Sequence, residues 1–247
     1  MRLKRLVGIA LFFLLIPCSW AAQPDAKGFA LVELFASEGC SNCPAADALL
    51  SQIIQKAKND HLPIYALSFQ VDYWNYMGWR DHFSSPLFTE RQGQYVFVLK
   101  ARGSYTPQMV VNGQKEFIGS EESMAWNVIN TFMNESTNDT IRLNLEKTVS
   151  SKVVVHYQLN RVVEHTALQL ALVESGIESH PNAGENDGLT LKHDNIVVEL
   201  KTIGVAEPKG EASFKLPAGV DLSKFAIIAY VQNLDDLKVL SAGSVEL

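Results

Sequence analysis

The stretch Ser37–Ala46, SEGCSNCPAA, holds two cysteines three positions apart, with a glycine before the first and a proline after the second. It lies between Phe29–Phe35, a short apolar run typical of a buried strand, and Ala45–Ala57, whose apolar residues recur at helical spacing. Proline fits the first turn of a helix, because that turn needs no amide hydrogen. The pattern predicts a strand-to-helix turn, with Cys40 just before the helix and Cys43 inside its first turn.

The start of a helix favours a thiolate, because unpaired backbone N–H groups and the helix dipole stabilise negative charge. Cys40 should feel this effect most, and the thiolate is the nucleophile in disulfide exchange. We therefore predict that Cys40 attacks a substrate disulfide and that Cys43 resolves the mixed disulfide. This chemistry needs no organic cofactor and no metal.

The first 21 residues have the anatomy of a secretory signal peptide. A basic start precedes the apolar run Leu6–Ile16, which is too short to span a bilayer, and Ser19 and Ala21 place small residues where signal peptidase reads. We predict cleavage after Ala21 and a periplasmic or secreted protein with no membrane span in its mature form. Cys18 leaves with the signal, and the remaining Cys40–Cys43 loop is too small to stabilise the fold much as a staple.

The charge balance disfavours nucleic acid and anionic lipid as partners. The chain has a formal net charge of −6, and the signal would remove three of its positive charges. A hydrophobic content of 47% suffices for a core and argues against disorder. The expected partners are protein or small-molecule disulfides and thiols, together with a redox partner whose identity the sequence leaves open.

The remaining pattern divides the chain into two parts. The first part alternates strands and helices, at Pro63–Val71 (strand), Leu87–Ala101 (helix), Gln108–Val111 and Lys115–Ile118 (a hairpin around Asn112-Gly113), and Ser120–Asn134 (a helix capped by Ser120). After a polar linker, strand-like runs follow without helices, at Ile141–Leu145, Val153–Leu159, Ala167–Val173, Asn195–Leu200, Ala212–Leu216 and Ala226–Val231. We predict an α/β domain over residues 22–135 and an all-β, sandwich-like domain over residues 136–247.

Thr106-Pro107 precedes the short strand that leads into the hairpin. Here the sequence resembles the thioredoxin fold, whose cis-proline loop stands at this point in chain order and lies against the Cys-x-x-Cys. The resemblance implies that Pro107 is cis and that the backbone of Thr106 can pair with a bound peptide. It also implies a role for Glu33, because thioredoxins carry a buried acid near this place that assists proton transfer to the resolving cysteine. Alternation puts Glu33 on a face with Leu31 and Phe35, so it is either partly buried or a solvated edge residue.

Other segments depart from thioredoxin. VDYWNYMGWRD (Val71–Asp81), the following SPLFTERQGQY, and KHDNIVVEL from Lys192 resemble a family of secreted bacterial proteins with a thioredoxin-like domain and a β-rich C-terminal region. That family is catalogued as a domain of unknown function (DUF1223-like), and the resemblance runs from about Phe29 to the end of the chain. Its aromatic segment forms either a stacking rim beside the thiols or loop packing, through Tyr73, Trp74, Tyr76 and Trp79.

Two other functions stay open. A Cu(I)-binding or metal-delivery protein on the same fold would use both thiolates with a histidine or methionine, and the nearest by chain order are His61, His82 and Met109. Alternatively, the protein is a non-catalytic interaction module whose β region binds a partner.

Two features of the β region are expected to have no chemical role. The segment Gly176–Gly188 has acids and asparagines without the regular alternation of a calcium loop, so we expect a flexible hairpin tip. His193 and Asp194 have no serine or further acid at a telling spacing, which favours a polar pair at a strand start.

Overall fold

The computed structural model describes residues 26–149, 152–204, 207–217 and 219–247. The predicted signal peptide, residues 1–21 with Cys18, lies outside the described residues. The helices within these ranges are α1 (Cys43–Asn59), α2 (Pro86–Leu99) and α3 (Glu122–Met133), with 3₁₀ turns η1 (Asn75–Met77) and η2 (Leu222–Lys224). Across these ranges, every helix is too short or too polar to cross a membrane.

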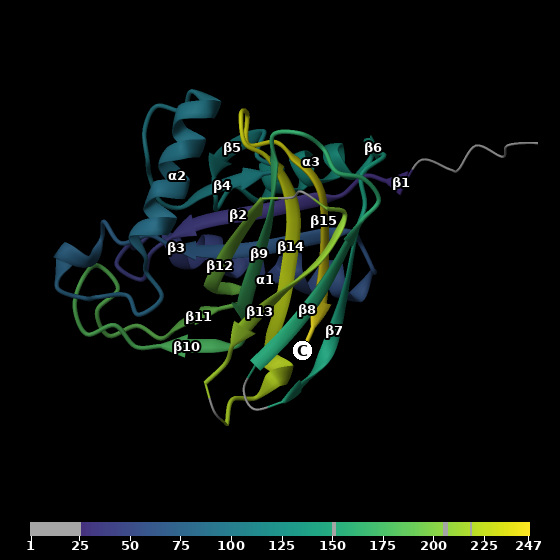
Figure 1. The fold of residues 1–247 in the computed structure, drawn as a ribbon. Coiled ribbons are helices and arrows are strands. Elements are labelled where there is room, and N and C mark those ends of the chain that lie inside the picture. The colour runs from purple at the N-terminus through teal and green to yellow at the C-terminus, as the bar shows by residue number, and fades with distance from the viewer. Residues whose placement is uncertain (1–25, 150–151, 205–206, 218) are drawn as a thin grey trace, which may run out of the picture.

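A single eight-stranded mixed sheet organises the molecule (Figure 1), with the strand order β15-β14-β9-β12-β3-β2-β4-β5. Its strands are β2 (Ala30–Ala36), β3 (Ile64–Gln70), β4 (Gln108–Val111), β5 (Lys115–Ile118), β9 (Thr166–Glu174), β12 (Ile196–Gly204), β14 (Phe225–Asn233) and β15 (Val239–Glu246). β2 runs parallel to β3 and antiparallel to β4, and β4 forms a hairpin with β5. The chain is therefore a mixed α/β protein dominated by sheet.

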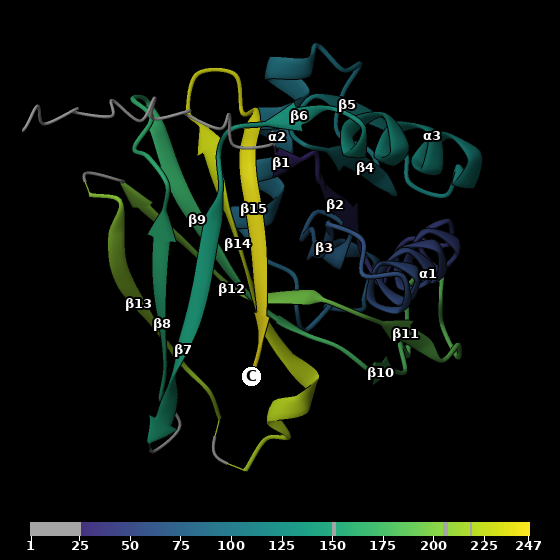
Figure 2. The same ribbon diagram turned by 90° about the vertical axis from the view of Figure 1, so that its right-hand side faces the viewer.

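A second, three-stranded sheet lies face to face with the antiparallel half of the large sheet (Figure 2). It consists of β7 (Ile141–Val149), β8 (Lys152–Leu159) and β13 (Lys209–Lys215). Val153 and Phe214 from this sheet share one core with Leu170 and Ile227 from β9 and β14. Two small sheets pair β1 (Ala26–Lys27) with β6 (Ser136–Thr137), and β10 (Ile177–Ser179) with β11 (Leu191–His193).

The predicted boundary at residue 135 falls between α3 and β6, but the large sheet does not stop there. β2 to β5 come from before the boundary, and β9, β12, β14 and β15 come from after it. The join is a parallel pairing of β12 with β3, where Ile196 lies opposite Ser68. The C-terminal strands do form two packed layers, yet one of these layers continues into the sheet of the N-terminal part. Alternation within a strand does not reveal its neighbour, so the sequence pattern could not show this continuity.

The start of α1 agrees with the sequence prediction, whereas the capping residue of α3 does not. α1 begins at Cys43 with Pro44 in its first turn, as predicted. α3 begins at Glu122, and its cap position is occupied by Glu121 without a side-chain cap hydrogen bond. The predicted cap at Ser120 is therefore wrong.

The central strand β2 sends alternate side chains into two different cores. Val32 and Leu34 face a core that contains Cys40 and Cys43 together with apolar residues of α1 and α3. The intervening Leu31 and Phe35 face a core built with α2 and the C-terminal strands. The cysteines and α2 consequently lie on opposite faces of the sheet.

Candidate functional site

The two cysteines sit at the turn from β2 into α1, as the sequence predicts. The N–H of Cys40 donates to the carbonyl oxygen of Ser37 at 3.1 Å, and the N–H of Cys43 donates to the carbonyl oxygen of Cys40 at 3.1 Å. Both are free thiols, and each residue is only 1% exposed. The turn is thus tightly closed, and it holds both thiols inside the protein.

The two thiols have very different acidities. The hydrogen bond from the Cys43 thiol lowers the pKa of Cys40 to about 6; burial opposes this effect, while Thr106 and the N–H groups of Asn42 and Cys43 add to it. Burial raises the pKa of Cys43 far above its ordinary value, and the neighbouring Cys40 raises it further. The site therefore favours the thiolate at Cys40 and the protonated thiol at Cys43.

Thr106 and Pro107 lie beside the first cysteine. The Sγ atom of Cys40 is 3.7 Å from the carbonyl oxygen of Thr106, and the Thr106–Pro107 peptide bond is cis. The carbonyl oxygen of Pro107 accepts a hydrogen bond from the N–H of Gly119 at 2.9 Å. The structure thus brings together four of the residues proposed from the sequence, namely Cys40, Cys43, Thr106 and Pro107.

Glu33 is the proposed site residue that the structure places elsewhere. Its carboxylate is fully buried on the α2 face of the sheet, where Arg91 Nε donates to it at 2.6 Å and the Tyr95 hydroxyl also donates to it. Arg91 also donates to Gln232 of β14 at 3.2 Å. The proposed catalytic role of Glu33 therefore needs correction, because alternation along β2 points it away from the cysteines. Its observed contacts tie α2 to the C-terminal strands.

The aromatic segment Val71–Asp81 covers the cysteine turn through two tryptophans. Trp74 packs against the core that contains both cysteines, and its Nε1 donates to Thr106 Oγ1 at 2.8 Å. Trp79 Nε1 donates to Glu38 Oε2 at 2.6 Å. Tyr76, by contrast, is 79% exposed. The segment thus packs on the turn and also borders the thiols, which joins the two interpretations that the sequence left open.

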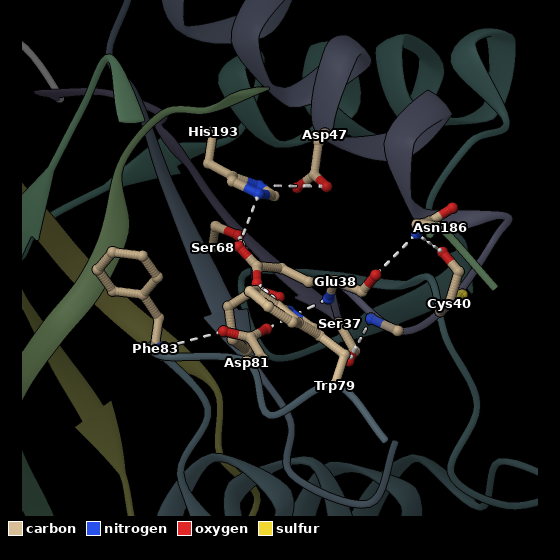
Figure 3. Close-up of polar contacts among 12 residues, drawn as sticks. Ser37, Glu38, Cys40, Asp47, Ser68, Trp79, Asp81, Phe83, Asn186 and His193 are labelled. Carbon is tan, nitrogen blue, oxygen red and sulfur yellow. Dashed lines mark hydrogen bonds and ion pairs between the residues drawn. The ribbon is translucent and has the colours of Figure 1, made fainter. Parts of the chain in front are cut away.

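A buried ionic cluster lies behind the turn, and the sequence analysis missed it (Figure 3). His193 from β11 sits between two carboxylates, with Nε2 3.5 Å from Glu38 and Nδ1 3.4 Å from Asp47. Burial opposes the charged imidazolium, but the carboxylates of Asp47 and Glu38 on either side of it raise the pKa of His193 to about 10. Burial and the charge of Glu38 raise the pKa of Asp81, which accepts from the Glu38 N–H at 3.2 Å, to about 6.

The tip of the β10–β11 hairpin also reaches the turn. The side-chain amide of Asn186 donates to the carbonyl oxygens of Glu38 at 2.8 Å and of Cys40 at 2.9 Å (Figure 3). The Glu185 carboxylate accepts hydrogen bonds from the N–H of Ser41 at 2.9 Å and from its hydroxyl at 2.7 Å. The sequence pattern predicts a flexible tip, whereas Asn186 is buried against the cysteine turn.

A family model described as "Protein of unknown function (DUF1223)" matches residues 31–232. The chain belongs to the DUF1223 family. This confirms the family resemblance seen in the aromatic segment and in KHDNIVVEL, and the family description assigns no activity.

The chain also matches solved structures. A crystal structure of a protein from Agrobacterium tumefaciens is 28% identical, with a TM-score of 0.66, and the match covers 91% of this chain and 96% of that one. A domain of the outer membrane lipoprotein Omp28 from Porphyromonas gingivalis is 15% identical over 45% of this chain and 96% of that chain, with a TM-score of 0.29. No curated protein matches the chain.

Metal binding gains no support from the donor set of this DUF1223 protein. Across the described ranges, no group of three or more histidine, cysteine and acidic side chains has an arrangement that could hold an ion. Met109 is buried in the same core as the two cysteines. His61 follows the far end of α1, and His82 borders a pocket on the other side of the sheet with Phe88. Of the residues considered for Cu(I), Met109 therefore shares a core with the two cysteines, whereas His61 and His82 lie elsewhere.

Proposed function

We propose that this protein is an exported thiol–disulfide oxidoreductase with a thioredoxin-like core, acting on protein or small-molecule disulfides. The succession β2–α1–β3, the antiparallel β4–β5 hairpin and the position of Thr106 beside Cys40 support this core. Export rests on the sequence of residues 1–21 and places the cysteine pair in an oxidising compartment. The redox partner in that compartment is a protein of unknown identity.

The observation that carries the proposal is the difference in acidity between the thiols of Cys40 and Cys43. Cys40 precedes α1 and receives the hydrogen bond of the Cys43 thiol, which holds the pKa of Cys40 at about 6. A nucleophile in disulfide exchange works best when its pKa lies near the ambient pH. A pair of inert core cysteines would instead have raised pKa values, because burial alone disfavours the thiolate.

The reaction conserves sulfur, protons and electrons. The Cys40 thiolate attacks one sulfur of a substrate disulfide, which forms a mixed disulfide and releases the other sulfur as a thiolate. Cys43 then loses its proton and attacks the Sγ of Cys40, which releases the second substrate thiolate. The two substrate sulfurs take up two electrons from the cysteines and two protons, one released by Cys43 and one from water, and the protein is left with a Cys40–Cys43 disulfide. Run in reverse, the same steps oxidise a dithiol.

The proton of Cys43 needs an acceptor on its own face of the sheet. Asp47 follows Cys43 by one turn of α1, and the charge of Asp47 contributes to the raised pKa of Cys43. His193 stabilises the Asp47 carboxylate from the other side at 3.4 Å. In this proposal Asp47, and not Glu33, accepts the proton of the resolving cysteine.

Turnover of a model disulfide tests the proposal. The substrate is a peptide whose disulfide joins a fluorophore to a quencher, with reduced glutathione as the electron source. We expect the wild-type protein to accelerate cleavage, and Cys40→Ser to lower the rate to the glutathione background, because serine does not form a thiolate. Ser123→Ala, at an exposed position of α3, is the matched control and should match wild type. A wild-type rate equal to background, with the cysteines fully reduced, would favour the interaction-module alternative.

A further inference from the structure

Access to Cys40 is the difficulty that the proposed function meets in this structure. Disulfide exchange requires a second disulfide to approach the Sγ of the attacking cysteine directly. Cys40 is 1% exposed, so a substrate disulfide has no open path to that sulfur. Some part of the surrounding protein has to move before the reaction can start.

Trp74 forms the first part of what covers the thiol. Its side chain packs against the core that holds both cysteines, and its indole N–H is bonded to Thr106. Trp74 also lies against the backbone of Gly39, the residue before Cys40, since a Cβ atom placed on Gly39 would lie 3.1 Å from the Cβ of Trp74. Trp74 thus bridges the two segments that border the Cys40 sulfur.

The hairpin tip, residues 180–190, forms the second part. It joins β10 to β11, and it reaches the turn from more than 140 positions along the chain. Asn186 is 2% exposed and donates from one side-chain amide nitrogen to the carbonyl oxygens of both Glu38 and Cys40. Glu185 adds the two hydrogen bonds to Ser41, at the N-terminal end of α1.

The two parts also touch each other. Gly78 has φ +96°, and a Cβ atom built on it would lie 3.4 Å from the Cβ of Ala183 in the tip. A Cβ atom on Gly184 would lie 3.8 Å from the Cβ atoms of both Met77 and Trp79, and 3.7 Å from the Cα of Gly39. The aromatic segment and the tip therefore close over the turn as one continuous layer, which we call the cover (residues 74–79 and 180–190).

We infer that the cover is a gate over Cys40, closed in this structure, and that it opens when the Asn186 and Trp74 hydrogen bonds break. The inference rests on the proposed function, since it concerns access to the same sulfur. These hydrogen bonds end on main-chain carbonyl oxygens or on the Thr106 hydroxyl, so water can replace them when the cover lifts. The gate would make the reaction rate depend on opening as well as on the acidity of Cys40, and would hold the thiolate back from unselective exchange.

The rate of Cys40 alkylation by iodoacetamide, with the modified cysteine identified by mass spectrometry, tests the gate. Asn186→Ala removes both hydrogen bonds of the Asn186 amide but leaves those between Glu185 and Ser41, and it should raise the rate on the order of tenfold. Asn182→Ala is the matched control, because Asn182 is an exposed residue of the same tip. Trp74→Phe keeps an aromatic ring but loses the N–H, and it should accelerate alkylation independently.

An unchanged rate in both Asn186→Ala and Trp74→Phe, with each variant folded by circular dichroism, would overturn the gate. Equal acceleration by Asn182→Ala would also overturn it, because the effect would then not depend on the bonds to the turn. Alkylation reports access without turnover, so the two proposals fail separately. Faster alkylation of Asn186→Ala without any disulfide turnover would support the gate and refute the oxidoreductase. Disulfide turnover by the wild-type protein, with unchanged alkylation in the variants, would support the oxidoreductase and refute the gate.

Discussion

Replacing Cys43 by alanine is expected to leave Cys40 covalently bound to its substrates in the native compartment. Cys40 can still attack a disulfide, but the thiol that would release the mixed disulfide is gone. Cys43→Ala also removes the hydrogen bond that lowers the pKa of Cys40 most, so attack should be slower than in the wild-type protein and the adducts should accumulate with time. Adducts recovered on a non-reducing gel and identified by mass spectrometry would name the substrates.

The control for trapping is the double variant Cys40→Ser/Cys43→Ala, which has no cysteine at the site and whose fold is checked by circular dichroism. Adducts should be abundant with Cys43→Ala, scarce with wild type and absent with the double variant. Adducts of equal abundance in wild type would mean that Cys43 does not resolve them, and their absence in Cys43→Ala would contradict attack by Cys40.

Replacing Arg91 by methionine should lower the free energy of unfolding by about 3–5 kcal/mol, as is typical when one partner of a buried ion pair is removed. The substitution keeps an unbranched side chain of similar length but leaves Glu33 buried without its cation. Gln232 and Tyr95 would lose hydrogen bonds at the same time. Denaturant unfolding measures the change.

Two further variants separate the ion pair from side-chain size. Arg102→Met is the matched control, because Arg102 is exposed, and it should change stability by less than about 0.5 kcal/mol. The double variant Arg91→Met/Glu33→Gln should recover part of the loss, since it removes the uncompensated charge. A loss below about 1 kcal/mol for Arg91→Met would show that the buried pair does not hold α2 against the C-terminal strands.

Local sequence signals predicted the cysteine turn well, because it is built from consecutive residues. Three local features determine where each thiol lies relative to α1: the apolar run before Cys40, Pro44 directly after Cys43, and the helical spacing that follows it. The resemblance to thioredoxin predicted a proline loop beside the first cysteine, and in the structure the carbonyl oxygen of Thr106 lies 3.7 Å from the Sγ of Cys40, 66 positions away.

The sequence did not predict the surroundings of the turn, because long-range pairing determines them. His193 lies near Glu38 and Asp47 only because the β10–β11 hairpin runs beneath α1, and Asn186 reaches Cys40 from 146 positions away. No spacing rule connects such residues. The face on which Glu33 lies was readable from alternation, but which of the two faces holds the cysteines depends on where α1 packs.

The pH dependence of Cys40 alkylation in the wild-type protein tests the central claim most directly. The cover lowers the rate at every pH but does not move the midpoint, and mass spectrometry separates Cys40 from Cys43. We expect the rate to rise with pH through a midpoint of about 6, because the Cys43 thiol and the start of α1 stabilise the Cys40 thiolate. A midpoint at or above about 8.5, the value of a free cysteine, would contradict an activated nucleophile at this site.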